Sequence, residues 1–168
     1  MGRTSIDYAR SNPSIVYAVS ASILPGPDRT GDGRGDYDNG LHAVWRSTDA
    51  GRSWEPARMI FNPGLTSQTI GNRIVVIADG PARGLLVNVF TQIDVVAGRA
   101  RNSLAVIRSA DQGQTWSAPR RIADMQGVGA RDPDDGTPVR DGAILPTIAA
   151  GPGGAASCAS CSNAMRRC

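Results

Sequence analysis

Apolar and polar positions alternate along this chain in short runs separated by turn-forming residues. The clearest runs are "SIVYAVSASI" from Ser14, "SQTIGNRIVVIADG" from Ser67 and "GLLVNVFTQID" from Gly84. They are rich in Val and Ile, and the turn sequence "DGPARG" separates the last two. Short apolar runs of this composition, bounded by Gly, Pro and Asp, are typical of β-strands. The pattern therefore predicts an all-β fold of many short strands joined by turns.

One part of this pattern occurs twice. A shift of 62 positions, from Asp49 to Asp111, aligns "HAVWRSTDAGRSWEPARMI" with "LAVIRSADQGQTWSAPRRI", and nine of the nineteen positions are identical. Chance alone would give only about one or two identities, so we interpret the two segments as an internal repeat of a supersecondary unit. In each copy an apolar run leads into a polar turn, and a second extended stretch begins at Trp54 or Trp116. This arrangement predicts a β-hairpin with a specialised turn.

The residues that the two turns share each suit a tight turn. The aspartate can accept hydrogen bonds from backbone N–H groups of its own loop, and the serine two positions earlier can share them. The glycine supplies a positive φ, and the tryptophan can cover the hairpin and fill the gap to the next sheet. These residues are Ser47, Asp49, Gly51 and Trp54 in the first copy and Ser109, Asp111, Gly113 and Trp116 in the second.

The shared residues fit the pattern S-x-D-x-G-x-[ST]-W, which resembles the Asp-box, or BNR repeat, of the sialidases and related β-propeller proteins. The resemblance covers most of residues 5–154. It implies a partial β-propeller of about two to three four-stranded antiparallel blades, in which an Asp-box hairpin joins the third and fourth strands. In that family the box lies on the face opposite the active site. The resemblance therefore implies that Asp49 and Asp111 shape their turns and do not catalyse.

The expected domain organisation follows from the length of the repeat. The blade pieces should span about 5–62, 66–123 and 139–154, whereas a closed propeller needs at least roughly four blades. An open stack of sheets exposes an apolar flank and sheet edges. We therefore expect a fragment, or a chain that needs missing blades or a partner to close the propeller. After Gly154 the composition shifts to small residues, Cys and Arg, and we expect residues 155–168 to form a Cys-rich tail outside the propeller that is disordered, foreign or out of frame.

The resemblance also implies a particular catalytic chemistry. Sialidases bind the substrate carboxylate with three Arg, and use a Tyr nucleophile activated by a Glu together with an Asp acid/base. The only Glu of this chain, Glu55, stands beside Trp54 in a box strand, and all the tyrosines (Tyr8, Tyr17 and Tyr37) precede the first box. No Tyr/Glu pair can be assigned on this basis. The remaining weak candidates for the ligand face are Arg73, Arg140, Asp141 and Asp94, for which surface or turn roles are the alternative.

Two segments carry residue types that bind metals. The loop "GPDRTGDGRGDYDNG" contains the aspartates Asp32, Asp36 and Asp38, which suit a hard cation such as calcium. It lacks the spacing and the final Glu of an EF-hand, so we interpret it as a solvated turn loop. The cysteines are Cys158, Cys161 and Cys168. Their C-x2-C spacing is half of a zinc site, but the single histidine, His42, is far away in sequence. We expect neither a metal nor another cofactor.

Composition and charge limit the partners. The net charge is +3, and all 18 basic residues are Arg, a bias that we attribute to a GC-rich coding sequence. The chain has no dense basic run and few aromatic residues, which argues against a dedicated nucleic-acid binder. No stretch approaches the roughly 18 apolar residues of a membrane span, and "MGRTSIDYAR" lacks the apolar core of a signal peptide. The family resemblance suggests a secreted or extracellular setting, so localisation stays open.

Two functional hypotheses follow. In the first, the chain is a fragment of a sialidase-like glycoside hydrolase of the exo-α-sialidase type, with an incomplete catalytic set. In the second, it is a non-catalytic Asp-box propeller module that binds glycans or protein through its loops. The missing Tyr/Glu pair favours the second hypothesis for this chain alone, and the resemblance favours the first for its parent. Whether any enzyme activity belongs to the chain stays open, and we expect the isolated chain to be inactive.

Overall fold

Antiparallel β-sheets build the part of the chain described by the computed structural model, which comprises residues 4–21, 42–64, 67–125, 130–139, 145–160 and 163–167. The first sheet has the strand order β1–β2–β3–β4. Its strands are β1 (Thr4–Tyr8), β2 (Val16–Ala21), β3 (His42–Ser47) and β4 (Arg58–Phe61). Each strand pairs with the next in sequence, so the sheet is a simple meander. The predicted all-β class with antiparallel four-stranded sheets is confirmed.

The second sheet repeats this order with longer strands, β5–β6–β7–β8. These strands are β5 (Ser67–Val76), β6 (Leu86–Val96), β7 (Arg99–Ser109) and β8 (Arg120–Asp124). A β-bulge interrupts the β5–β6 pairing between Ile70 and Arg73. Gly71 within it has a φ of 75°, a conformation that glycine adopts without a Cβ clash.

A third sheet has the order β11–β12–β13, formed by β11 (Pro146–Ala150), β12 (Ala156–Ser160) and β13 (Asn163–Arg167). A short 3-10 turn, η1 (Pro152–Gly154), joins its first two strands. The sequence places residues 155–168 outside the sheets, and the structure differs, because β12 pairs with β11 in register. Cys158 is 1 % exposed and disulfide-bonded. Ala156 and Cys158 of this strand pack with apolar residues of the second sheet, which composition alone does not reveal.

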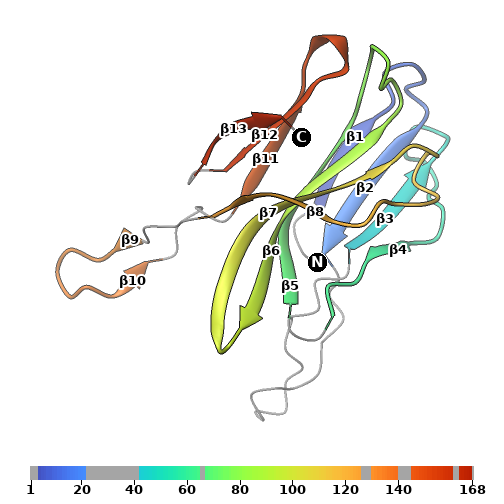
Figure 1. Ribbon diagram of the computed structural model, residues 1–168. Helices are drawn as coiled ribbons and strands as arrows, with labels where there is room; N and C mark the ends of the chain where they lie inside the picture. The colour runs from blue at the N-terminus through green and yellow to red at the C-terminus, as the bar shows by residue number, and fades with distance from the viewer. Residues whose placement is uncertain are drawn as a thin grey trace.

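A separate hairpin of β9 (Ala130–Arg131) and β10 (Pro138–Val139) precedes the third sheet and projects away from the stack (Figure 1). The predicted third blade piece therefore differs from the observed sheet at both ends. The predicted piece spans 139–154, whereas the sheet begins at Pro146 and ends at Arg167.

The three larger sheets lie side by side, with the second sheet between the other two (Figure 1). Their first strands meet, and side chains of one sheet satisfy the backbone of the next. Ile74 N donates to Ser5 Oγ at 3.2 Å, and Val76 N donates to Asp7 Oδ2 at 2.8 Å. Because β5 is an edge strand, these N–H groups have no neighbouring strand to pair with. The two hydrogen bonds join the first sheet to the second.

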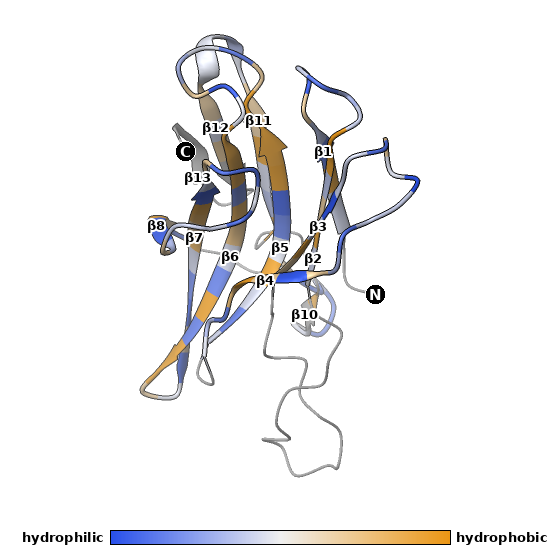
Figure 2. Cartoon of the chain, turned by 90° about the vertical axis from the view of Figure 1, so that its right-hand side faces the viewer, coloured by the Kyte–Doolittle hydropathy of each residue, from blue (hydrophilic) through white to orange (hydrophobic). Residues whose placement is uncertain are grey.

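Strand β6 carries the centre of the core. Its residues Leu86, Val87, Val89 and Phe90 are each at most 1 % exposed, because both faces of the second sheet are covered. Leu86 packs with the cluster of the first sheet, whereas Val89 packs with Cys158 of the third. The neighbouring β5 is hydrophilic in its middle and hydrophobic toward its arrowhead (Figure 2).

Candidate functional site

The first box turn, Ser47–Trp54, is held by its own side chains. Asp49 Oδ1 accepts hydrogen bonds from Ser53 N at 2.8 Å and from Ser47 Oγ at 2.7 Å. Ser47 Oγ in turn accepts a hydrogen bond from Gly51 N at 2.8 Å. The carboxylate therefore bonds to the backbone of its own loop, as predicted.

The second turn has the same geometry. Asp111 Oδ1 accepts hydrogen bonds from Thr115 N at 2.9 Å and from Ser109 Oγ at 2.8 Å, and Gly113 N donates to Ser109 Oγ at 2.8 Å. Gly113 has a φ of 85°, and Gly51 has a φ of 86°. The positive φ expected of both glycines is confirmed.

Each turn also holds a second left-handed residue, which the sequence did not reveal. Ala50 has a φ of 61° and Gln112 a φ of 60°. This conformation is uncommon for residues other than glycine. The hydrogen bonds of the serine and aspartate that precede this residue fix the loop, so that the chain tolerates the conformation.

The box carboxylates are ionised and fully engaged. Hydrogen bonds from the side chain and backbone of Ser53 lower the pKa of Asp49 to about 2. The equivalent bonds from Thr115 lower the pKa of Asp111 to about 2. A carboxylate with such a pKa cannot act as a general acid near neutral pH. Both aspartates therefore act as structural parts of their turns.

The two box tryptophans differ in their surroundings. Trp116 packs against apolar clusters shared by the first and second sheets, and its Nε1 donates to Gly113 O at 3.2 Å. Trp54 is 40 % exposed. The prediction that each ring fills the gap to a neighbouring sheet holds for Trp116 and is wrong for Trp54, because no described sheet lies against the outer face of the first one.

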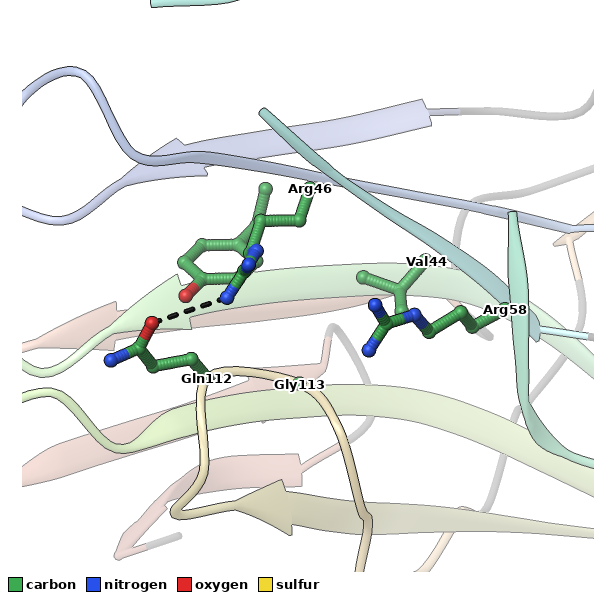
Figure 3. Close-up of a pocket in the computed structure, with 6 residues that line it drawn as sticks. Val44, Arg46, Arg58, Gln112 and Gly113 are labelled. Atoms are coloured by element: carbon green, nitrogen blue, oxygen red, sulfur yellow. Dashed lines mark hydrogen bonds between the residues drawn. The ribbon is translucent and has the colours of Figure 1, made fainter. Parts of the chain in front are cut away.

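A cluster of polar side chains lies between the first two sheets, beside the second box turn. Arg46 forms an ion pair with Glu55 at 2.7 Å, and Arg58 forms another with the same carboxylate at 2.9 Å. The Arg46 Nη1 atom also donates to Gln112 Oε1 at 3.2 Å (Figure 3). The buried Tyr17 side chain, 2 % exposed, lies next to this arginine. The structure thus brings a tyrosine near the only glutamate, a proximity that sequence reasoning missed because 38 positions separate Tyr17 from Glu55.

This cluster does not have the properties of a nucleophilic site. Burial raises the pKa of Tyr17 and the Glu55 charge adds to the rise, whereas Arg46 opposes it; the net shift is upward. A phenol with a raised pKa is a poor nucleophile at neutral pH. The cavity beside it measures about 10 Å³, which is space for about one water molecule and none for a sugar. We therefore interpret these residues as a polar contact between sheets.

The opposite end of the second sheet holds another carboxylate. Asp94, 16 % exposed, accepts hydrogen bonds from Ser67 Oγ at 2.7 Å and Gln92 Nε2 at 2.8 Å, and forms an ion pair with Arg121 at 2.8 Å. Burial alone would raise its pKa, but the hydrogen bonds and the arginine charge outweigh burial and lower the pKa below its ordinary value. Asp94 lies in β6 and not in a turn. It carries a negative charge at neutral pH, so it does not suit the role of a catalytic acid.

The other residues considered from the sequence do not converge with it. Arg73 is exposed on β5 and pairs with Val89, five positions along β6 from Asp94, which corresponds to about 16 Å. Five further candidates for ligand or metal binding lie outside the described residues: Asp32, Asp36, Asp38, Arg140 and Asp141. The residues that the structure describes therefore form no cluster of arginines that could bind the carboxylate of a substrate.

A buried amide pair in the second sheet was not predicted at all. Asn88 Nδ2 donates to Asn72 Oδ1 at 3.3 Å, while Asn72 Nδ2 and Asn88 Oδ1 have no hydrogen-bond partner. Both side chains are at most 3 % exposed. Unsatisfied buried polar atoms are uncommon in folded proteins. The signal available in the sequence was two asparagines inside otherwise apolar strands.

Among the described residues, no group of three or more His, Cys, Asp or Glu side chains is placed to hold a metal ion. The described part of the chain contains no helix long and apolar enough to cross a membrane. No protein-family model matches the sequence, and no curated protein matches it significantly.

Proposed function

We propose that this chain forms part of a sialidase-like Asp-box β-propeller, in which sheets β1–β4 and β5–β8 are consecutive blades. The observation that carries the proposal is the repetition of the whole four-stranded unit. In each sheet the strands follow one another in order, and a box turn joins the third strand to the fourth. The first strands of the two sheets adjoin, as the innermost strands of neighbouring blades do.

In this proposal the chain supplies framework to a glycoside hydrolase, and the catalytic set is not complete within it. Two arginines already engage the Glu55 carboxylate, and Tyr17 is buried with a raised pKa. The Asp94 carboxylate stays ionised. Hydrolysis by a tyrosine nucleophile needs all its partners in one pocket, because the loss of one partner removes most of the rate.

A non-catalytic module that binds glycans or protein is the second candidate, supported by the outer face of the first sheet. Ile6, Tyr8, Trp54 and Met59 are each at least 40 % exposed there. By the strand register, Ile6 and Tyr8 stand in β1 where Ile74 and Val76 stand in β5. Those two β5 residues pack against the first sheet. An apolar face of this kind suits a protein partner.

The framework role predicts that the isolated chain does not hydrolyse a fluorogenic sialoside. We expect the chain to release no more fluorophore than a double variant carrying Arg73→Ala and Arg140→Ala. Saturation-transfer NMR with sialyllactose, performed on the same samples, would detect binding without turnover and so support the module. Turnover by the chain that the double variant loses would contradict the framework role.

A further inference from the structure

A groove of about 320 Å³ separates the second sheet from the third. Its lining is mostly apolar, with a single charged residue. The lining residues are Ile77, Ala82, Leu85, Val87, Arg108, Gly153, Gly154, Ala155 and Ala156. Arg108 directly precedes the serine of the second box, so the groove opens at the box end of the sheets.

The first two sheets show what a groove in this position can hold. Val16 pairs with Ser47 in the first sheet, as Leu86 pairs with Ser109 in the second. When the two sheets are aligned on these box serines, the wall of the groove that belongs to the second sheet has a counterpart in the first sheet. Val87 and Arg108 occupy the positions that Tyr17 and Arg46 occupy there.

The counterpart site is filled by the second box turn. Gln112 Oε1 accepts a hydrogen bond from Arg46 at 3.2 Å (Figure 3). The next residue, Gly113, lies against both sheets. A Cβ added to it would meet Leu86 Cδ1 at 3.5 Å and Tyr17 Cε1 at 3.7 Å. The turn thus fits between an arginine, a large side chain of the first sheet and a large side chain of the second.

The other wall of the groove also has its counterpart. Ala156 pairs with Ala150 at the start of β12, as Leu86 pairs with Val76 at the start of β6. Both walls of the filled site therefore have equivalents in the groove. Val87 stands in place of Tyr17, and Ala156 stands in place of Leu86. The filled site keeps a cavity of only about 10 Å³, whereas the groove has about 320 Å³. No box turn of the described residues lies in it, since the second box occupies the first junction.

We propose that this groove is the docking site for the Asp-box turn of a separate β-hairpin. The box glycine packs between Val87 and Ala156, and the polar side chain before it lies beside Arg108, as Gln112 lies beside Arg46. This inference rests on the internal repeat alone and does not depend on the proposed role in glycan hydrolysis. Two small wall residues leave room for larger side chains on the incoming turn than Gln112 and Gly113.

The test uses the full chain and a synthetic peptide with the sequence of residues 103–124, labelled with fluorescein. We expect saturable binding in fluorescence anisotropy. Ala82→Trp should weaken binding at least tenfold because the indole fills the groove from its lining. Arg83→Trp is the matched control, since Arg83 is exposed and outside the lining, and it should leave binding unchanged. A peptide carrying Gly113→Val should bind at least tenfold more weakly, because valine disfavours the φ of 85° that the turn needs at this position, whatever space the groove offers.

Circular dichroism melting curves establish that both protein variants fold. If Ala82→Trp does not fold, Arg108→Ala replaces it, and a several-fold loss of peptide binding is expected. Absence of binding, or equal binding to the groove variant and the control, would overturn the proposal. Sedimentation that reveals a dimer dissociated by Ala82→Trp would assign the groove to a second copy of the chain and would also overturn it.

Discussion

At the scale of single residues, each box carboxylate acts on its own loop. Asp49 and Asp111 accept hydrogen bonds from the residue four positions later and from the serine two positions earlier. These bonds need the ionised carboxylate, because a protonated carboxyl accepts them less well. The same residue type at Asp94 has different partners, from three strands of one sheet. The local turn and the assembled sheet therefore use aspartate in different ways.

The lowered pKa of Asp111 makes part of the stability dependent on pH. The folded pKa of about 2 lies below the ordinary value of 3.8. The contribution of the carboxylate is therefore complete above pH 4 and disappears as the pH falls toward 2. We expect Asp111→Asn to unfold at lower urea concentration than the parent at pH 6, with a smaller difference between the two proteins at pH 3.

Ala110→Asn is the control for this experiment, because it adds an amide to an exposed position of the same turn without changing a charge. It should not alter the pH dependence. A constant difference between Asp111→Asn and the parent from pH 6 to pH 3 would show that ionisation of this carboxylate does not stabilise the turn.

At the scale of the element, the two box hairpins share the internal hydrogen bonds of their turns but differ in what packs against them. Both turns have equivalent hydrogen bonds, and their left-handed residues stand at equivalent positions. Their tryptophans nevertheless have different surroundings, because Trp116 packs against the first sheet, whereas no described sheet lies against the side of the first hairpin that carries Trp54. Sequence similarity therefore predicts the hairpin and not its burial.

This difference predicts unequal effects of the same substitution. Trp116→Ala removes a ring packed against two apolar clusters and should lower the free energy of unfolding by about 3 kcal/mol. Trp54→Ala removes a ring that is 40 % exposed and should lower it by about 1 kcal/mol or less. Urea unfolding followed by circular dichroism measures both. Equal losses would mean that Trp54 is buried to the same degree in solution.

At the scale of the whole molecule, close contacts at glycines join the second sheet to the third. Gly154 N donates to Asp79 Oδ1 at 2.8 Å, which joins the second sheet to the third. Gly71 lies in the bulge of β5, where an added Cβ would meet Pro146 Cδ at 2.7 Å and Leu145 Cδ2 at 3.3 Å. The bulge therefore permits β11 to approach β5 closely.

Gly71→Ala should consequently separate these two sheets. The φ of 75° makes any Cβ unfavourable, by about 1–2 kcal/mol, and crowding against Pro146 adds about 1–3 kcal/mol. Gly84→Ala is the matched control, because its φ is 85° and nothing lies within 4 Å of an added Cβ. Thermal and urea unfolding should show a larger loss for Gly71→Ala. Similar losses would indicate that the third sheet does not pack on the bulge.

Part of this architecture could be predicted from the sequence, and for local reasons. Alternating apolar runs predicted strands, and the repeated Ser, Asp and Gly predicted the two box turns, because their bonding partners lie within four positions. The observed first and second sheets extend from Thr4 to Phe61 and from Ser67 to Asp124, close to the predicted pieces 5–62 and 66–123. The strand pairing of residues 156–160 was missed, because small residues carry no clear strand pattern.

The sequence by itself determined the strand-rich class, the hairpin repeat and the chemistry of each box turn, because these depend on residues that are neighbours along the chain. Only the tertiary structure decided which copies are buried and which side chains meet. It placed Tyr17 beside Arg46 and Glu55, engaged Asp94 in an ion pair with Arg121, and left a groove where Val87 and Ala156 stand in place of larger residues. Such contacts join residues far apart in sequence, so their geometry depends on how the sheets stack and not on any local pattern.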